Sequence, residues 1–259
     1  MRIGVYYYKK ENESIAELVI READRFGFSL DNKTPDIVIS IGGDGTFLRC
    51  VHHYLNRLAN TAFIGINSGS LGFYCDFVKE EITSLFEMIS QEDYVINEHS
   101  LLCGNLEYKD GCETIYAVNE IRIENPRHTL KCSVFINDEK LESFRGNGLV
   151  ISSTLGSSGY NKSLGGALVD HELEALQLTE VAPLSNNVYR TLGSPLILSP
   201  ERVINIDGAL SNAVVGYDHL NVQERELLSI SVGYSDKKLF ILTPSDKTYI
   251  SKIRKSFVL

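Results

Sequence analysis

The chain has 259 residues, of which 43% are hydrophobic and 23% charged, enough to bury the core of one large domain or two smaller ones. Its formal net charge of −9 argues against nucleic-acid binding, which requires a basic surface. No apolar run approaches the roughly 20 residues of a membrane helix, and the five cysteines show no C-x-x-C pair. We therefore expect a cytoplasmic protein without a disulfide framework, a structural zinc site or a membrane partner.

Strands and helices are expected to alternate along the first hundred residues. Continuous apolar runs predict buried strands, and apolar residues three or four positions apart predict helices between them. This rhythm is typical of a parallel sheet covered by helices on both faces, so we expect a Rossmann-like α/β domain. The expected strands are 2–8, 36–41 and 62–66, and the expected helices are 15–26, 46–58 and 80–89.

The pattern changes after about residue 97, where many short strand candidates follow one another. We expect a mostly antiparallel, β-rich second domain that contains one helix, at 171–179. The tail, 247–257, is expected to form a helix with a basic face that packs back on the first domain. The expected domains are therefore 1–97, completed by 247–259, and 98–246.

The stretch "DIVISIGGDGTF" places Asp44 between glycines where an expected strand ends and a helix begins. Glycines at such a corner let backbone N–H groups approach a phosphate, and the helix N-terminus favours an anion. A carboxylate repels phosphate, but it can accept the proton of an attacking hydroxyl, as the catalytic aspartate of kinases does. Alternatively, Asp44 caps the following helix. The motif alone leaves both roles open.

Two further stretches are rich in glycine and polar residues. "NSGSLGF" follows the expected strand 62–66, and if both strands belong to one sheet, this corner would converge with the first on one crevice. A single loop of this kind is commonly only a turn. "SSGYNKS" gathers hydroxyl, amide and amine groups, which suit a nucleotide but are also common in an ordinary polar loop. Asn119-Glu120 could hydrogen-bond a ribose or an adenine, although such a pair more often marks a strand-end turn.

Taken together, these stretches resemble the NAD kinases along nearly the whole chain, and most closely the short bacterial enzymes. GGDG alone is weak, because 6-phosphofructokinases and diacylglycerol and sphingosine kinases also carry it. The ordered combination is specific. Its pieces are "GGDGT", "GINSGSLGF", Asn119-Glu120, "FRGNGLVIS", "SSGYNKSLGGAL", "YRTLGSPLIL" and "YDHL".

The resemblance implies a kinase that transfers a phosphoryl group from ATP or polyphosphate to the adenosine-ribose 2′-hydroxyl of NAD, making NADP. It implies that Asp44 is the catalytic base and that Gly43 and Gly45 belong to the phosphate loop. The remaining matches to substrate-binding positions are Asn119 and Glu120 at the adenosine ribose; Ser158, Gly159 and Tyr160 beside the adenosine; Arg145, Asn147, Ala182, Leu184 and Tyr189 toward the second nucleotide or the subunit contact; and Asp218 and His219 near a shared site.

The resemblance further implies a homodimer or homotetramer in which subunits share sites. The sequence offers no carboxylate cluster that would cage a metal, so we expect a divalent ion, Mg²⁺, to arrive with the donor phosphates. Three stretches depart from the family pattern: Asn147 stands where an aspartate is usual, 153–156 lacks the usual proline, and Ser158-Gly159-Tyr160 replaces Thr-Ala-Tyr.

Two rival functions follow from the same residues. A lipid or sugar-phosphate kinase of the same superfamily would share GGDG, but a lipid kinase needs a membrane-facing segment and a sugar-phosphate kinase needs several arginines near the corners. Only Arg49 is close to them. A non-catalytic nucleotide sensor could keep the pocket, and the intact Asp44 argues against it.

Overall fold

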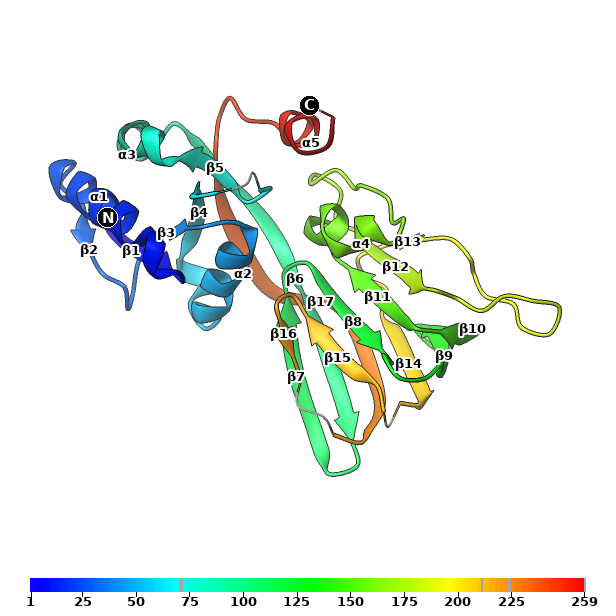
Figure 1. The fold of residues 1–259 in the computed structure, drawn as a ribbon. Coiled ribbons are helices and arrows are strands. Elements are labelled where there is room, and N and C mark those ends of the chain that lie inside the picture. The colour runs from blue at the N-terminus through cyan, green and yellow to red at the C-terminus, as the bar shows by residue number, and fades with distance from the viewer. Residues whose placement is uncertain (70–71, 211, 223–224, 259) are drawn as a thin grey trace. The chain divides into compact units, whose positions relative to one another are not determined.

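The structure is a computed structural model that describes residues 1–69, 72–210, 212–222 and 225–258. It forms two compact units (Figure 1): residues 1–99 with 237–259, and residues 100–236. The sequence assigned 237–246 to the second domain. In the structure this segment belongs to the first unit, because Phe240 and Ile241 pair in parallel with Ala62 and Phe63.

The first unit is an α/β layer structure, as predicted. Its sheet is mostly parallel: strand β17 (Leu227–Pro244) is followed by β4, β3, β1 and β2, each paired in parallel with its neighbour, and β5 also pairs in parallel with β4. Every residue of β3 is buried, so both faces of the sheet are covered. The elements are β1 (Arg2–Tyr7), α1 (Glu13–Arg25), β2 (Ser29–Leu30), β3 (Ile37–Ile41), α2 (Asp44–His53), β4 (Ala62–Asn67), β5 (Cys75–Val78), α3 (Ile82–Gln91) and α5 (Tyr249–Phe257).

Helices α1 and α3 share one hydrophobic core with the isoleucines of β1, β3 and β4. Helix α2 packs elsewhere on the sheet, where the Phe47 ring meets the Phe63 ring edge-on with 6.3 Å between centroids. Helix α2 ends at His53, five residues before the expected end at Leu58, and a short 3-10 turn (Leu58–Asn60) follows. Strand order and helix placement together put the corner after β3 at the carboxyl edge of the sheet.

The second unit consists of two antiparallel sheets around its own core, as predicted. One has the order β10-β9-β14-β17-β6-β7 and the other β13-β12-β11-β8-β15-β16. The strands are β6 (Tyr94–Tyr108), β7 (Gly111–Ala117), β8 (Glu120–Glu124), β9 (Leu130–Ile136), β10 (Glu139–Gly146), β11 (Gly148–Ser152), β12 (Leu176–Val181), β13 (Leu196–Leu198), β14 (Ile204–Ala209), β15 (Val214–Tyr217), β16 (Leu220–Asn221) and β17 (Leu227–Pro244).

The prediction of a helix at 171–179 is wrong. Residues 176–181 form β12, in which Leu176 and Leu178 point into the core, while β11 and β13 pair with its two edges. The run "HELEALQLTE" carries both a helical and an alternating pattern, and pairing with two neighbours decides between them. The helical pieces of this unit are instead a 3-10 turn (Leu155–Ser158) and the four-residue α4 (Tyr160–Ser163). None of the described helices could span a membrane.

Candidate functional site

The Gly42–Gly45 corner joins the end of β3 to the start of α2. Gly42 has φ of 154°, and an added Cβ would overlap the Thr46 side chain, so the turn requires glycine there. Gly43 occupies the N-cap position, and Asp44 is the first residue of the helix. A Cβ at Gly43 or Gly45 would meet nothing within 4 Å. Packing among the described residues therefore does not explain glycine at 43 and 45, and space remains beside the helix N-terminus.

The Asp44 carboxylate is held by the backbone of another segment. The Phe73 N–H donates to Oδ2 at 2.9 Å, and the Tyr74 N–H donates to Oδ1 at 3.0 Å. The carboxylate thus connects α2 to a segment about thirty residues away. It does not cap the helix, contrary to the alternative prediction. Each carboxylate oxygen has two lone pairs, which leaves acceptor capacity for a hydroxyl proton.

The second glycine corner meets the first in the structure. Its glycine at 72 lies against Asp44, where an added Cβ would overlap Oδ1, so this close approach needs a glycine. The corner begins at Asn67, the buried last residue of β4, whose Oδ1 accepts the Gly69 N–H at 2.9 Å. Ser70 and Leu71, which belong to the same predicted loop, lie outside the described residues.

In the second unit, sheet topology brings one group of predicted residues together. Strand β8 lies between β11 and β15 and runs antiparallel to both, with Ser152 opposite Glu120 and Tyr217 opposite Ile121. The start of β8 therefore meets the ends of its two neighbours. At this edge lie Asn119, Glu120, Ser158, Gly159, Asp218 and His219. An added Cβ on Gly159 would stand 3.5 Å from Asn119 Nδ2 and 4.0 Å from Glu120 Oε2.

Asp218 fixes the turn that carries Asn119 and Glu120. Asp218 is 8% exposed, and its carboxylate accepts the Val118 N–H at 2.8 Å and the Asn119 N–H at 2.7 Å. Ser153 supports the same turn from the other side, through its N–H to the Asn119 carbonyl (2.8 Å) and its hydroxyl to the Val118 carbonyl (2.6 Å). Asp218 itself has φ of 46°, a left-handed conformation that is uncommon for residues other than glycine. Such conformations are often found at functional sites, where the surrounding contacts hold them in place.

Glu120 is 5% exposed, and burial raises the pKa of its carboxyl group to about 8. The nearby negative charge of Asp218 raises this pKa further, and the Arg122 guanidinium opposes both effects. Arg122 lies 3.6 Å from Oε1, too far for a strong hydrogen bond, so burial dominates. The carboxyl group is therefore mostly protonated at neutral pH, and it can donate a hydrogen bond as well as accept one.

Replacing Glu120 by glutamine is expected to change how stability depends on pH. The folded-state pKa lies above the unfolded value of 4.5, so between pH 4.5 and about 8 unfolding releases a proton and stability falls as pH rises. The contribution approaches about 1.4 kcal/mol per pH unit in that window. Glu120→Gln should flatten this slope, measured as urea midpoints from pH 5 to 8. An unchanged slope in the variant would mean that Glu120 is ionised in the folded protein.

A second group of predicted residues lies at the opposite end of the same strands. Asn147 donates its N–H to the Val181 carbonyl at 2.9 Å, and the Leu184 N–H donates to the Arg145 carbonyl at 2.7 Å. The Arg145 guanidinium lies 3.8 Å from the centre of the Tyr189 ring. Because β8 has only five residues, about 13 Å of strand separates this group from the first. Ala182, which has φ of 45°, also belongs to this end.

Tyr160 spans the distance between the two groups. It begins α4 beside the first group, and its hydroxyl donates to Glu124 Oε1 at 3.0 Å, at the far end of β8. The residue is 37% exposed, so part of it is accessible to solvent.

The sequence missed four residues that shape these sites. Phe73 and Tyr74 act through backbone N–H groups, and Ser153 braces a turn 34 residues away, so none has a sequence signature. Arg122 could have been found. Strand periodicity places it on the same face as Glu120 and Glu124, and it forms ion pairs with both, at 3.6 and 3.4 Å.

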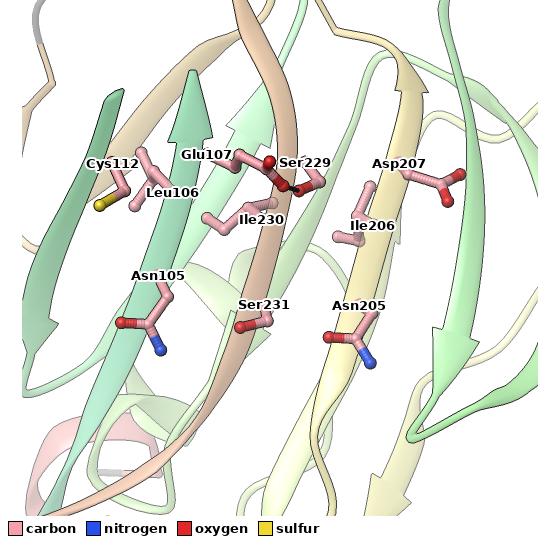
Figure 2. Close-up of a pocket in the computed structure, with 10 residues that line it drawn as sticks. All are labelled: Asn105, Leu106, Glu107, Cys112, Asn205, Ile206, Asp207, Ser229, Ile230 and Ser231. Atoms are coloured by element: carbon pink, nitrogen blue, oxygen red, sulfur yellow. Dashed lines mark hydrogen bonds between the residues drawn. The ribbon is translucent and has the colours of Figure 1, made fainter. Parts of the chain in front are cut away.

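A groove of about 410 Å³ lies apart from all predicted site residues, on the other sheet of the second unit. Figure 2 shows asparagine, serine and acidic side chains from β6, β14 and β17 around it, with the Ser229 hydroxyl donating to Glu107 at 2.9 Å. Nothing there resembles a base beside a phosphate loop. Among the residues that the structure describes, no three His, Cys, Asp or Glu side chains are grouped as a metal site requires.

A parallel sheet with a glycine-rich corner at a helix N-terminus is typical of α/β proteins that bind phosphate groups. Family models narrow this class. Residues 8–94 match the ATP-NAD kinase N-terminal domain, and residues 118–242 match the ATP-NAD kinase C-terminal domain. The chain belongs to the ATP-NAD kinase family.

Individual proteins agree with this assignment. The chain is 39% identical over 236 residues to NAD kinase 1 of Bacillus anthracis, covering 90% of this chain and 89% of the relative. It is 36% identical to the NAD kinase of Limosilactobacillus reuteri, covering 100% and 98%. Two solved structures share its fold: yeast NADH kinase complexed with NADH (TM-score 0.86, 19% identity, 99% and 87% covered) and an Archaeoglobus fulgidus NAD kinase in complex with ATP (0.79, 21%, 98% and 99%).

Proposed function

We propose that this chain is an NAD kinase that transfers a phosphoryl group from ATP or polyphosphate to the adenosine-ribose 2′-hydroxyl of NAD, giving NADP. The observation that carries the proposal is the position of the Asp44 carboxylate. It is held by the Phe73 and Tyr74 N–H groups, and it lies beside two glycines, Gly43 and Gly45, at which an added Cβ would meet no described atom within 4 Å. Family membership supports the substrate, since the curated relatives are named NAD kinases.

The Asp44 carboxylate accepts the proton of the attacking hydroxyl while that oxygen forms its bond to phosphorus. The N–H groups at Gly43 and Gly45 and the N-terminus of α2 stabilise the negative phosphate oxygens. In the second unit, Asn119 and protonated Glu120 bind the adenosine ribose, and Ser158, Gly159 and Tyr160 line the adenosine. These last roles rest on the family resemblance and on the gathering of the residues at one sheet edge.

A divalent metal fits this chemistry without a protein cage. Both Asp44 oxygens already accept N–H groups, and no described cluster supplies three ligands. We therefore propose that Mg²⁺ comes with the donor phosphates and water, and that it neutralises charge on the transferred group.

The proposal is tested by offering ATP and polyphosphate as donors against NAD, NADH, a diacylglycerol and a sugar phosphate as acceptors. The expected result is phosphorylation of the dinucleotide alone. Phosphorylation of the lipid or the sugar phosphate instead would support the rival kinase functions. Tight NAD binding without turnover under any donor would support a nucleotide sensor.

Asn147→Asp is expected to tighten NAD binding about five-fold, since a hydrogen bond to a charged acceptor is worth about one kcal/mol more than a neutral one. Asn147 is exposed, and its backbone is already fixed by Val181 and Asn125, so the substitution should not disturb the fold. Calorimetric titration of NAD into both forms measures the change, while the rate at saturation should stay the same. Weaker binding would mean that the added charge repels the ligand phosphates.

We propose a cytoplasmic homodimer or homotetramer whose sites are shared between subunits, with Leu184, Tyr189, Asp218 and His219 near the contact. Activity per subunit should then fall as dilution dissociates the oligomer, followed in parallel by light scattering. A monomer with full specific activity would contradict shared sites.

A further inference from the structure

The C-terminal helix α5 rests on the segment that holds Asp44. The Phe73 ring lies 5.4 Å from the Phe257 ring and 6.4 Å from the Tyr249 ring, measured between centroids. Lys252 Nζ donates to Asp76 Oδ2 at 2.9 Å, and this ion pair is largely buried, with side chains 16% and 6% exposed. The helix therefore contacts the chain on both sides of residues 74–75. This agrees with the expectation that the tail packs on the first domain.

Successive residues of that segment are anchored to different helices. Tyr74 stacks on Phe47 of α2 with 4.7 Å between ring centroids and 1° between ring planes. Phe73 is anchored to α5 instead, and it is 8% exposed. Their adjacent N–H groups are the two donors to the Asp44 carboxylate. One donor is thus fixed by the helix that Asp44 begins, and the other by the C-terminal helix.

Helix α5 adds little to the core of its unit. None of its residues is buried, and the hydrophobic core cluster of the first unit contains no residue from it. Its N-terminus has its own cap, in which the Thr248 hydroxyl accepts the Ser251 N–H at 3.1 Å. The described contacts of the helix are therefore better explained by support of the Asp44 segment than by core stability.

We propose that α5 is a positioning element for the reaction, which holds Phe73 so that its N–H group orients the Asp44 carboxylate. Phe257, Tyr249 and Phe73 are positioning residues in this account, because their rings act through the backbone at Phe73. The inference rests on the proposed role of Asp44 as the base. It explains why a helix outside the core contributes two aromatic contacts to Phe73 and a largely buried ion pair to Asp76.

The test is Phe257→Ala in the full chain, with Ile250→Ala as the matched control on the same helix. Phe257 is 40% exposed and Ile250 is 66% exposed, so neither change should unfold the protein. In Phe257→Ala we expect kcat to fall about ten-fold with both KM values unchanged, because small misplacements of a catalytic group cost up to about 100-fold. Phe257→Leu should restore most of the rate, and Ile250→Ala should match the unsubstituted protein.

A second readout does not depend on catalysis. Hydrogen exchange at the Phe73 and Tyr74 amides, measured by NMR, should speed up about ten-fold or more in Phe257→Ala while core amides of β3 stay protected. Unchanged exchange together with unchanged kcat would overturn the inference, as would an equal loss in Ile250→Ala. If exchange rises but Asp44→Asn stays active, α5 holds the segment and the proposed function of Asp44 is what fails.

Discussion

Replacing Asp44 by asparagine is expected to lower kcat by about 10²–10⁴-fold, the range for removal of a general base. An asparagine keeps the side-chain shape, but its amide cannot take a proton at neutral pH. It also keeps only one oxygen for the two N–H groups of Phe73 and Tyr74, so the segment should loosen slightly. Affinity for NAD should change little, because Asp44 is assigned to proton transfer.

The matched control is Asp24→Asn, which removes the same charge from an exposed position on α1. In this control, the steady-state rate of NADP formation and the calorimetric affinity for NAD should both equal those of the unsubstituted protein. If Asp44→Asn retains more than half of the rate, Asp44 serves the fold and another group must take the proton.

The second large effect is expected for Asp218→Ala, which should lower the free energy of unfolding by about 3 kcal/mol. The buried carboxylate accepts two N–H groups, and hydrogen bonds to a charged group contribute roughly 1.5–3 kcal/mol each. Alanine would leave the Val118 and Asn119 N–H groups without that acceptor. It would also stand at φ of 46°, where a residue with a plain Cβ is disfavoured. NAD binding should weaken as well, because the turn carries Asn119 and Glu120.

Asp218→Asn is the control, because asparagine tolerates the left-handed conformation and keeps one oxygen acceptor. It should show roughly half the shift in the urea midpoint, since one of the two hydrogen bonds can remain. An alanine variant as stable as the unsubstituted protein would show that the two hydrogen bonds do not fix the turn.

The sequence allowed the parallel sheet to be predicted because its strands are buried on both faces and read as continuous apolar runs, as in 36–41. It failed at 171–179, where a helical spacing and an alternating one coincide and strand pairing decides. Likewise, only short strands were expected after residue 97, whereas 227–244 form one long strand, β17, because Tyr234 to Leu239 contain no glycine or proline that would interrupt it.

The sequence indicated which residues to consider for the candidate site, but it did not indicate the contacts among them. The glycine spacing marks Asp44, yet nothing at 73–74 indicates that these two N–H groups hold its carboxylate, since any residue supplies a backbone donor. Likewise, Asp218 was expected near the substrate. Its contacts are with the Asn119 turn, which depends on β8 and β15 being neighbours in the sheet.

The most direct test of the proposed function is ³¹P NMR of the product formed from NAD and ATP in the presence of Mg²⁺. The proposal predicts one new phosphomonoester, on the adenosine-ribose 2′-oxygen, formed in equal amount to ADP and formed about 10²–10⁴-fold more slowly with Asp44→Asn. A phosphomonoester at another position, or the same product at an unchanged rate with Asp44→Asn, would contradict it.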